Sequence, residues 1–80
     1  MGIAKSEAEL ADRLSRYVKA ELKRADVTYE TLADRLARHG LKGETRDSIA
    51  AKLKRGTFAA TFLIGVLAAL ELEGVRLEDI

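Results

Sequence analysis

The fold is decided by residues 27–56, which read VTYETLADRLARHGLKGETRDSIAAKLKRG. Leu32 and Leu36 stand four residues apart in this stretch, as they would on one face of a helix. Thr28 precedes them and is the expected N-cap, because its hydroxyl oxygen can accept a hydrogen bond from a free backbone amide. Gly40 is expected to end the helix, since glycine adopts the left-handed conformation without steric cost. The pattern therefore predicts a short amphipathic helix between Thr28 and Gly40.

A second short helix is expected after a turn, between Thr45 and Gly56. Thr45 is its expected N-cap, and Asp47 stands in the first turn, where a carboxylate interacts favourably with the helix dipole. Ile49 and Leu53 are spaced so that both would face the core. The stretch as a whole predicts two short amphipathic helices around a turn.

A longer helix is expected before this pair. Ser6 and Glu9 form a predicted capping box. In it the Ser6 hydroxyl accepts a hydrogen bond from a free backbone amide of the helix, and the Glu9 carboxylate accepts one from the backbone amide of Ser6. An apolar stripe continues at helical spacing to about Arg24, through Leu10, Leu14, Tyr17, Val18 and Leu22. The basic residues on its flanks are expected to be solvated, namely Arg13, Arg16, Lys19 and Lys23. Residues 1–5 precede the cap and are expected to be flexible.

An apolar helix is expected after the pair. Thr57 is its predicted N-cap, the helix should run from Phe58 to about Leu72, and Gly74 should close it. Its core-facing side carries Phe58, Phe62, Leu63, Val66, Leu67, Ala69 and Leu70. A short tail follows. Across all four helices, the expected core consists of Leu14, Val18, Leu32, Leu36, Leu53, Phe62, Val66 and Leu70.

The opposite side of the apolar helix holds small residues and one large aliphatic side chain. Ala60, Ile64 and Ala68 share this side, with Thr61 and Gly65 beside them. Small residues permit close helix–helix contact, and large apolar patches are uncommon on the surfaces of monomers. We therefore expect Ala60, Ile64 and Ala68 to form the seam of a homodimer. The alternative is that Ile64 is a single exposed aliphatic residue, which is normal for a protein surface.

Length and composition indicate one all-α domain over residues 1–80. Apolar residues make up 48% of the chain and charged residues 34%, which is an ordinary globular balance, and proline is absent. The chain has no cysteine, which excludes a disulfide framework and argues against a structural zinc site. The longest nearly apolar run, residues 58–70, is too short to cross a bilayer, so a cytoplasmic location is expected.

The charged residues are distributed unevenly along the chain, although the net charge is only +1. Residues 1–37 balance, with seven basic and seven acidic side chains. Residues 38–55 carry six basic and two acidic side chains, a net +4, and residues 71–80 carry one basic and four acidic, a net −3. The excess positive charge therefore lies on the turn and the second short helix, where it would favour a polyanionic partner.

Several segments resemble phage-repressor-like (XRE/Cro type) helix-turn-helix domains. Residues 28–33, TYETLA, resemble the start of the second helix of that motif, and residues 48–56, SIAAKLKRG, resemble its recognition helix. Residues 58–72, followed by GVRL at residues 74–77, resemble the apolar closing helix and its tail. The layout of residues 12–80 is also similar to an uncharacterised bacterial family of small domains.

The resemblance implies a domain of four to five helices, similar to the lambda-repressor domain, with a short C-terminal tail. It implies sequence-specific binding of duplex DNA by a small bacterial transcriptional regulator, which reads the major groove with the helix at residues 45–55. On this prediction, base edges are read by Arg46, Ala51 and Lys54. The predicted phosphate contacts are Thr28, Tyr29, Lys42, Thr45, Lys52 and Arg55.

Two features depart from the resembled motif. Ile49 stands sixteen positions after Ala33, where the compact motif has about ten, so residues 38–43 lengthen the helix and the turn. The residue before the final Arg-Gly pair is Lys54, where the motif often has an acidic one. We therefore keep a second prediction open. It is a protein-interaction module, such as an adaptor or an antitoxin-like partner, that has the fold without binding DNA.

Nothing in the sequence indicates an enzyme. The chain has no cysteine nucleophile, no serine–histidine pair in a motif context, no glycine-rich phosphate loop and no metal-ligand spacing. His39 is the only histidine, and it is expected to lie beside a helix end, where a cation is mildly favourable. We therefore expect no catalytic residues, no metal ion, no cofactor and no small-molecule substrate.

Overall fold

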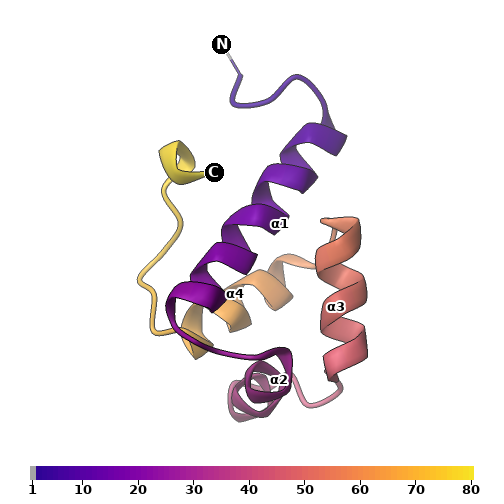
Figure 1. Ribbon diagram of the computed structural model, residues 1–80, viewed down its shortest axis with the longest axis vertical. Helices are drawn as coiled ribbons and strands as arrows, with labels where there is room; N and C mark the ends of the chain where they lie inside the picture. The colour runs from indigo at the N-terminus through magenta and orange to yellow at the C-terminus, as the bar shows by residue number, and fades with distance from the viewer. Residues whose placement is uncertain (1) are drawn as a thin grey trace.

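The computed structural model describes residues 2–80, which form four α-helices and a short 3-10 helix (Figure 1). The helices are α1 (Glu7–Arg24), α2 (Tyr29–Arg38), α3 (Arg46–Arg55), α4 (Ala60–Ala69) and the 3-10 helix η1 (Leu77–Asp79). No β-strand occurs within this described part of the chain. The prediction of an all-α protein with four main helices is confirmed.

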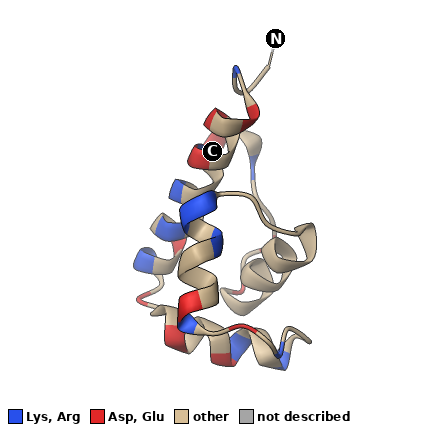
Figure 2. Cartoon of the chain, turned by 90° about the vertical axis from the view of Figure 1, so that its right-hand side faces the viewer, with Lys and Arg blue, Asp and Glu red and all other residues tan. Residues whose placement is uncertain are grey.

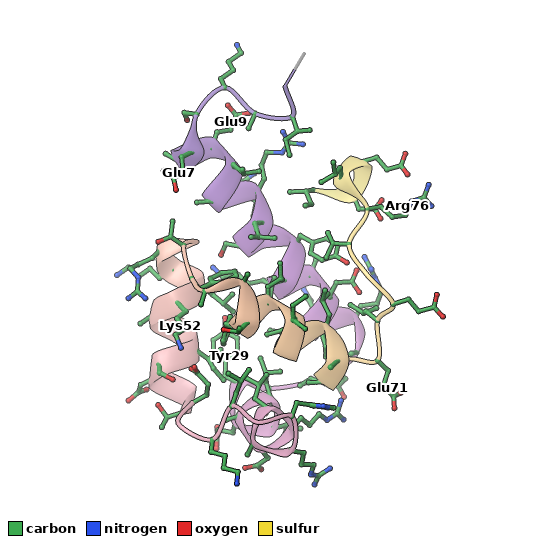
Figure 3. All side chains as sticks on the ribbon, turned by 180° about the vertical axis from the view of Figure 1, so that it is seen from behind. Glu7, Glu9, Tyr29, Lys52, Glu71 and Arg76 are labelled. Carbon is green, nitrogen blue, oxygen red and sulfur yellow. The ribbon has the colours of Figure 1, made fainter. Side chains whose placement is uncertain are left out.

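The long helix α1 forms the spine of the molecule, and the three shorter α-helices are arranged around it, with the end of α3 against its N-terminal half (Figure 1). Helix α3 packs against α1 and α2, and α4 packs against α2. Helix α4 lies behind α1 in Figure 1 and in front of it in Figure 3, which gives the reverse view. Helices α3 and α4 therefore face different sides of the molecule.

Both ends of the described chain lie near the start of α1. The Arg13 guanidinium donates hydrogen bonds to the backbone carbonyls of Ile3 and Ile80, which joins the N-terminal segment to the end of the tail. These contacts involve part of the segment 1–5 that was expected to be flexible; Met1 lies outside the described residues.

The first three helices begin where their sequences predict. The hydroxyl oxygens of Ser6, Thr28 and Thr45 each accept a hydrogen bond from the amide three residues further on. The predicted return bond in the first cap was wrong. The Glu9 carboxylate accepts from the amide of Lys5 at 3.2 Å, because the chain before Ser6 bends back over the start of α1.

Three helices end in the same way, with one residue in the left-handed region followed by a backbone hydrogen bond that spans the last turn. The left-handed residues are Asp26 (φ 57°), Gly40 (φ 93°) and Glu71 (φ 59°). The closing bonds join Val27 N to Leu22 O, Leu41 N to Leu36 O, and Leu72 N to Leu67 O, each at 2.9 Å. The predicted stop at Gly40 is confirmed, and Asp26 ends α1 close to the predicted Arg24.

Helix α4 is shorter at both ends than its sequence suggests. The predicted cap at Thr57 was wrong: the N-cap is Ala59, and no side chain caps the helix. Residues 57–59 belong to no helix, and the Phe58 ring lies edge-on to Phe62 with 5.1 Å between the ring centroids, a favourable aromatic arrangement.

The C-terminal end of α4 also differs from the prediction. The helix ends at Ala69, before the predicted Leu72, and Gly74 lies beyond it in the tail. Glu71 takes the left-handed conformation in place of a glycine. The cost of roughly 1–2 kcal/mol for a non-glycine residue there is offset by the closing bond from Leu72.

The core is a single cluster to which all four helices contribute. Its buried members are Val18, Leu22, Val27, Leu32, Leu36, Ile49, Leu53, Phe62, Val66 and Ala69. Six of the eight predicted core residues are among them. The other two, Leu14 and Leu70, are half-buried and pack against the cluster.

Candidate functional site

Helix α3 contacts the core mainly through two buried side chains, those of Ile49 and Leu53. The rest of the helix therefore presents a polar face to solvent. The exposed residues of the helix are Arg46, Asp47, Ala51, Lys54 and Arg55. All three predicted base-reading residues and the predicted phosphate contact Arg55 are in this set. Figure 2 looks onto this helix and shows basic positions in its last turn and at its start. The structure thus brings these predicted site residues together on one exposed helix.

The position of α3 is fixed at both ends. At its start, the Ser48 hydroxyl accepts from the Thr45 amide at 2.8 Å, while the Thr45 hydroxyl accepts from the Ser48 amide at 3.1 Å. At its end, Gly56 has φ 73° and lies so close to α1 that a Cβ atom would stand 2.5 Å from the carbonyl oxygen of Ala11. The chain can therefore take this path only with glycine there.

A buried hydrogen bond also attaches α3 to α1. The Ser15 hydroxyl donates to the backbone carbonyl of Leu53, and Ser15 is the one buried polar residue within residues 2–80. The bond satisfies a hydroxyl that would otherwise be costly to bury. Helix α3 is therefore held on a rigid support while its outer face remains exposed.

Arg46 lies at the point where the first turns of α2 and α3 come close. Its Nε atom is 3.9 Å from a Glu30 carboxylate oxygen, and its Nη1 atom is 3.5 Å from Asp47 Oδ1. The Arg46 side chain is 66% exposed. Ion pairs this long and this exposed contribute little free energy, so the guanidinium can exchange these partners for an anionic ligand.

Lys52 has a different environment from the other predicted cationic residues. Its ammonium group forms an ion pair and hydrogen bond with Glu44 and lies 4.9 Å from the centre of the Phe62 ring. The side chains of Lys52 and Glu44 are 27% and 10% exposed. The predicted phosphate contact at Lys52 stays a prediction, and it requires this pair to open.

Glu44 was not singled out by sequence reasoning. Its carboxylate also accepts a hydrogen bond from the Ser48 hydroxyl at 2.7 Å. Burial tends to raise the pKa of Glu44, but hydrogen bonds from Lys52 and Ser48 and the lysine charge outweigh burial and hold the pKa below its usual value. Because Glu44 lies in the turn and Lys52 two helical turns later, no helical spacing links them in the sequence.

The remaining predicted phosphate contacts lie at the edges of α2 and α3. Lys42 is exposed in the turn between the two helices, and Thr28 and Thr45 are exposed N-caps. Tyr29 is half-buried and packs against the core. These residues approach α3 from the side of its first turn.

A hollow lies where the end of α1 meets the first turns of α2 and α3. Its lining residues are Lys19, Leu22, Lys23, Val27, Thr28, Tyr29, Glu30 and Arg46. We refer to it as the three-helix hollow. It brings the predicted site residues Thr28, Tyr29 and Arg46 together with two α1 lysines that the sequence assigned to a solvated face. Their i,i+4 spacing is the only sequence signal that places both lysines on one side of α1.

The predicted dimer seam lies on the opposite side of the core, along a groove between α4 and the end of α2. The groove is lined by His39, Gly40, Leu41, Ala60, Thr61, Ile64, Gly65 and Ala68. We refer to it as the α4 groove. It contains all three predicted seam residues, and Ile64 is 64% exposed beside it. Leu41 forms part of its lining, since Gly65 carries no side chain that would collide with the Leu41 methyl group.

No cluster of three or more His, Cys, Asp or Glu side chains within residues 2–80 could hold a metal ion. None of the helices described is both long enough and apolar enough to cross a membrane.

The chain belongs to a protein family described as "Domain of unknown function (DUF6471)", whose model matches residues 10–75. The match agrees with the expected membership of a family of small domains, and the description names neither a fold nor a function. No curated protein and no solved structure matches the chain.

Proposed function

We propose that this member of the DUF6471 family is a small cytoplasmic transcriptional regulator that binds duplex DNA with α3 as its recognition helix. The proposal rests above all on one observation, the exposed face of α3. Arg46, Ala51 and Lys54 project from a helix that Ile49 and Leu53 hold on the core. A helix with one free, basic face has the shape and charge to enter a major groove about 12 Å wide.

The order of the helices supports a lambda-repressor-like helix-turn-helix arrangement. Helix α2 and helix α3 are both ten residues long and pack against each other, and α1 supports α3 from behind. Residues 39–45 connect them, which is more than the three or four residues of a compact helix-turn-helix turn. In the proposed complex this longer connection places Lys42 beside the DNA backbone, next to the first turn of α3.

Four of the five exposed residues of α3, all but Asp47, would have a distinct part in recognition. The Arg46 guanidinium can donate to O6 and N7 of one guanine, the contact that best distinguishes a base pair. The Ala51 methyl group suits the methyl group of thymine, and Lys54 suits an acceptor on a base edge. Arg55 and Lys42, together with the hydroxyls of Thr28, Tyr29 and Thr45, would contact phosphates.

A binding assay on a random-sequence duplex pool tests the proposal. The wild-type protein should shift part of the pool at about 50 mM salt, with an affinity that falls steeply as salt rises, because bound cations release condensed counterions. Arg55→Ala should weaken binding to all sequences alike. Arg46→Ala should cost about 1–3 kcal/mol on the selected site only and relax the preference at one base pair.

Arg76→Ala is the matched control, because Arg76 is paired with Glu78 in the tail and lies on the other side of the molecule from Lys52 (Figure 3). It removes the same charge and should leave the affinity unchanged. If the wild-type protein shifts no duplex at about 50 mM salt, the proposal fails.

A second candidate function, a protein-interaction module, is favoured by the α4 groove. The groove has no Lys, Arg, Asp or Glu in its lining, and Ile64 stands exposed at its side. We propose that this face, with Ala60, Ile64 and Ala68 as the seam, joins two copies of the chain. In a DNA-binding dimer, the two α3 helices would be about 34–36 Å apart, as adjacent major grooves require. An adaptor or antitoxin-like protein would use the groove without that spacing.

A further inference from the structure

We infer that the three-helix hollow binds a backbone phosphate of the same duplex, held by Lys19 and Lys23 next to the base-reading Arg46; this inference rests on the proposed DNA binding. Lys19 and Lys23 are one helical turn apart on α1, and both are exposed. Across residues 2–80, neither lysine has an acidic side chain within 4.0 Å of its ammonium group. Their charges are therefore available to an external anion.

The shape of the hollow strengthens its attraction for an anion. Its floor is apolar, since Leu22 and Val27 are buried members of the core, while its rim carries three cations from two helices against one carboxylate. A concave region with low-dielectric walls and an excess of charge of one sign concentrates the electrostatic field. The Thr28 and Tyr29 side chains supply hydroxyl groups at the same place.

Arg46 connects this site to the recognition helix. It lines the hollow and also belongs to the exposed face of α3, so a phosphate in the hollow would be next to the groove that α3 enters. The bound phosphate is therefore one of the DNA backbone and not of a separate small ligand. Binding would anchor the start of α3 and fix its register along the duplex, which is what phosphate contacts do in protein–DNA complexes.

Glu30 is the one acidic residue in the lining of the hollow, and its carboxylate is 3.9 Å from Arg46 Nε. A phosphate bound by Lys19 and Lys23 would lie near this carboxylate, against the repulsion of like charges. Removing the Glu30 charge should therefore strengthen DNA binding. A variant that merely damaged the fold would have the opposite effect.

The experiment measures the affinity for a fixed duplex as a function of salt for Lys19→Gln/Lys23→Gln, with Arg38→Gln as the matched control. Arg38 is exposed at the far end of α2 and lies outside the lining of the hollow. Losing the contact with this one phosphate should make the slope of log K against log salt shallower by about 1, so that the affinity ratio between about 50 and 200 mM salt shrinks roughly fourfold. The control should keep the wild-type slope.

Two more variants make the result specific. Lys19→Arg/Lys23→Arg keeps both charges and should retain the slope of the wild-type protein. Glu30→Gln should bind about threefold more tightly at 50 mM salt, consistent with one repulsive charge removed near a phosphate. Circular dichroism of each variant should match that of the wild-type protein.

The possible outcomes distinguish a failure of phosphate binding in the hollow from a failure of the proposed DNA binding. If Arg55→Ala lowers the slope but Lys19→Gln/Lys23→Gln does not, the hollow does not contact DNA and the proposed function stands. If Glu30→Gln weakens binding, the inference is likewise overturned. If the wild-type protein binds no duplex, the proposed function fails and the hollow loses its ligand with it.

Discussion

Helices α3 and α4 are each ten residues long, yet they hold their positions by different physical means. Helix α3 buries little more than two side chains and is fixed by the capping box at Thr45, by Gly56 and by the bond from Ser15. Helix α4 has no side-chain cap and no charged residue, and it buries Phe62, Gly65, Val66 and Ala69. Figure 2 shows the contrast, with basic and acidic positions on α3 and none on α4.

The comparison teaches what each outer face can bind. The exposed face of α3 is polar and mostly basic, so it is stable in water and suits an anion. The exposed face of α4 carries Ile64 and small residues, so it gains free energy only when other apolar surface covers it. One small domain thus offers two faces with different chemistry, and the predictions below test whether they are independent.

The largest expected effect is on the inner face of α4. Phe62→Ala should lower the free energy of unfolding by about 3–5 kcal/mol, because the ring is 2% exposed and contacts both Phe58 and the Lys52 ammonium group. Urea denaturation measures the change. Ile64→Ala on the outer face is the control and should cost no more than about 0.5 kcal/mol. Equal losses for the two variants would contradict the assignment of inner and outer faces.

The next largest effect tests how α3 is held on α1. Gly56→Ala should destabilise the protein by at least about 2 kcal/mol, since it adds a backbone collision with Ala11 to the strain of the left-handed conformation. Gly40→Ala is the matched control: Gly40 also has positive φ, but a Cβ there meets nothing within 4 Å, so only the strain of about 1–2 kcal/mol applies. If the two alanine variants are equally stable in thermal and urea unfolding, the close contact between α3 and α1 is wrong.

A smaller effect is expected from the ion pair that joins the turn to α3. Glu44→Gln should cost about 1.5–3 kcal/mol at neutral pH, because it weakens hydrogen bonds between a charged carboxylate, Lys52 and Ser48. The folded pKa of Glu44 lies below its unfolded value of 4.5, so its contribution is present above about pH 4.5 and is lost as the pH falls through the folded pKa.

Urea unfolding between neutral and acidic pH measures this dependence. The wild-type protein should lose stability with falling pH more steeply than Glu44→Gln. Glu30→Gln is the control, because Glu30 is 77% exposed and its removal should leave the pH dependence nearly unchanged. A Glu44→Gln curve parallel to that of the wild-type protein would show that the pair does not stabilise the fold.

Local signals predicted most of the fold. The caps at Ser6, Thr28 and Thr45 and the stop at Gly40 depend on neighbouring residues, so the sequence alone indicates them. The start of α4 was mispredicted because it depends on a tertiary contact. Thr57 is a good cap by composition, but the Phe58 ring packs against the core and the helix begins only after Ala59.

The same distinction applies to the candidate site. The spacing of Ile49 and Leu53 defines the buried side of α3, so its exposed side could be read from the sequence. The sequence does not reveal that Lys52 pairs with Glu44 or that Lys19 and Arg46 lie close together, because each of these contacts joins residues from different elements. Sequence periodicity predicts which residues share a face, and only the fold decides which faces meet.

The smallest effect on stability should accompany the largest effect on association. Ile64→Asp places a charge on an exposed position and should change the free energy of unfolding of the monomer by no more than about 0.5 kcal/mol. The same charge in the α4 groove would be buried without a partner in a dimer, so the variant should sediment as a monomer at concentrations where the wild-type protein is a dimer. Ala51→Asp adds the same charge on the exposed face of α3 and should leave the sedimentation unchanged while abolishing DNA binding. A wild-type protein that sediments as a monomer at high micromolar concentration would reject the seam at Ala60, Ile64 and Ala68, and Ile64 would then be a single exposed aliphatic residue on a monomeric domain.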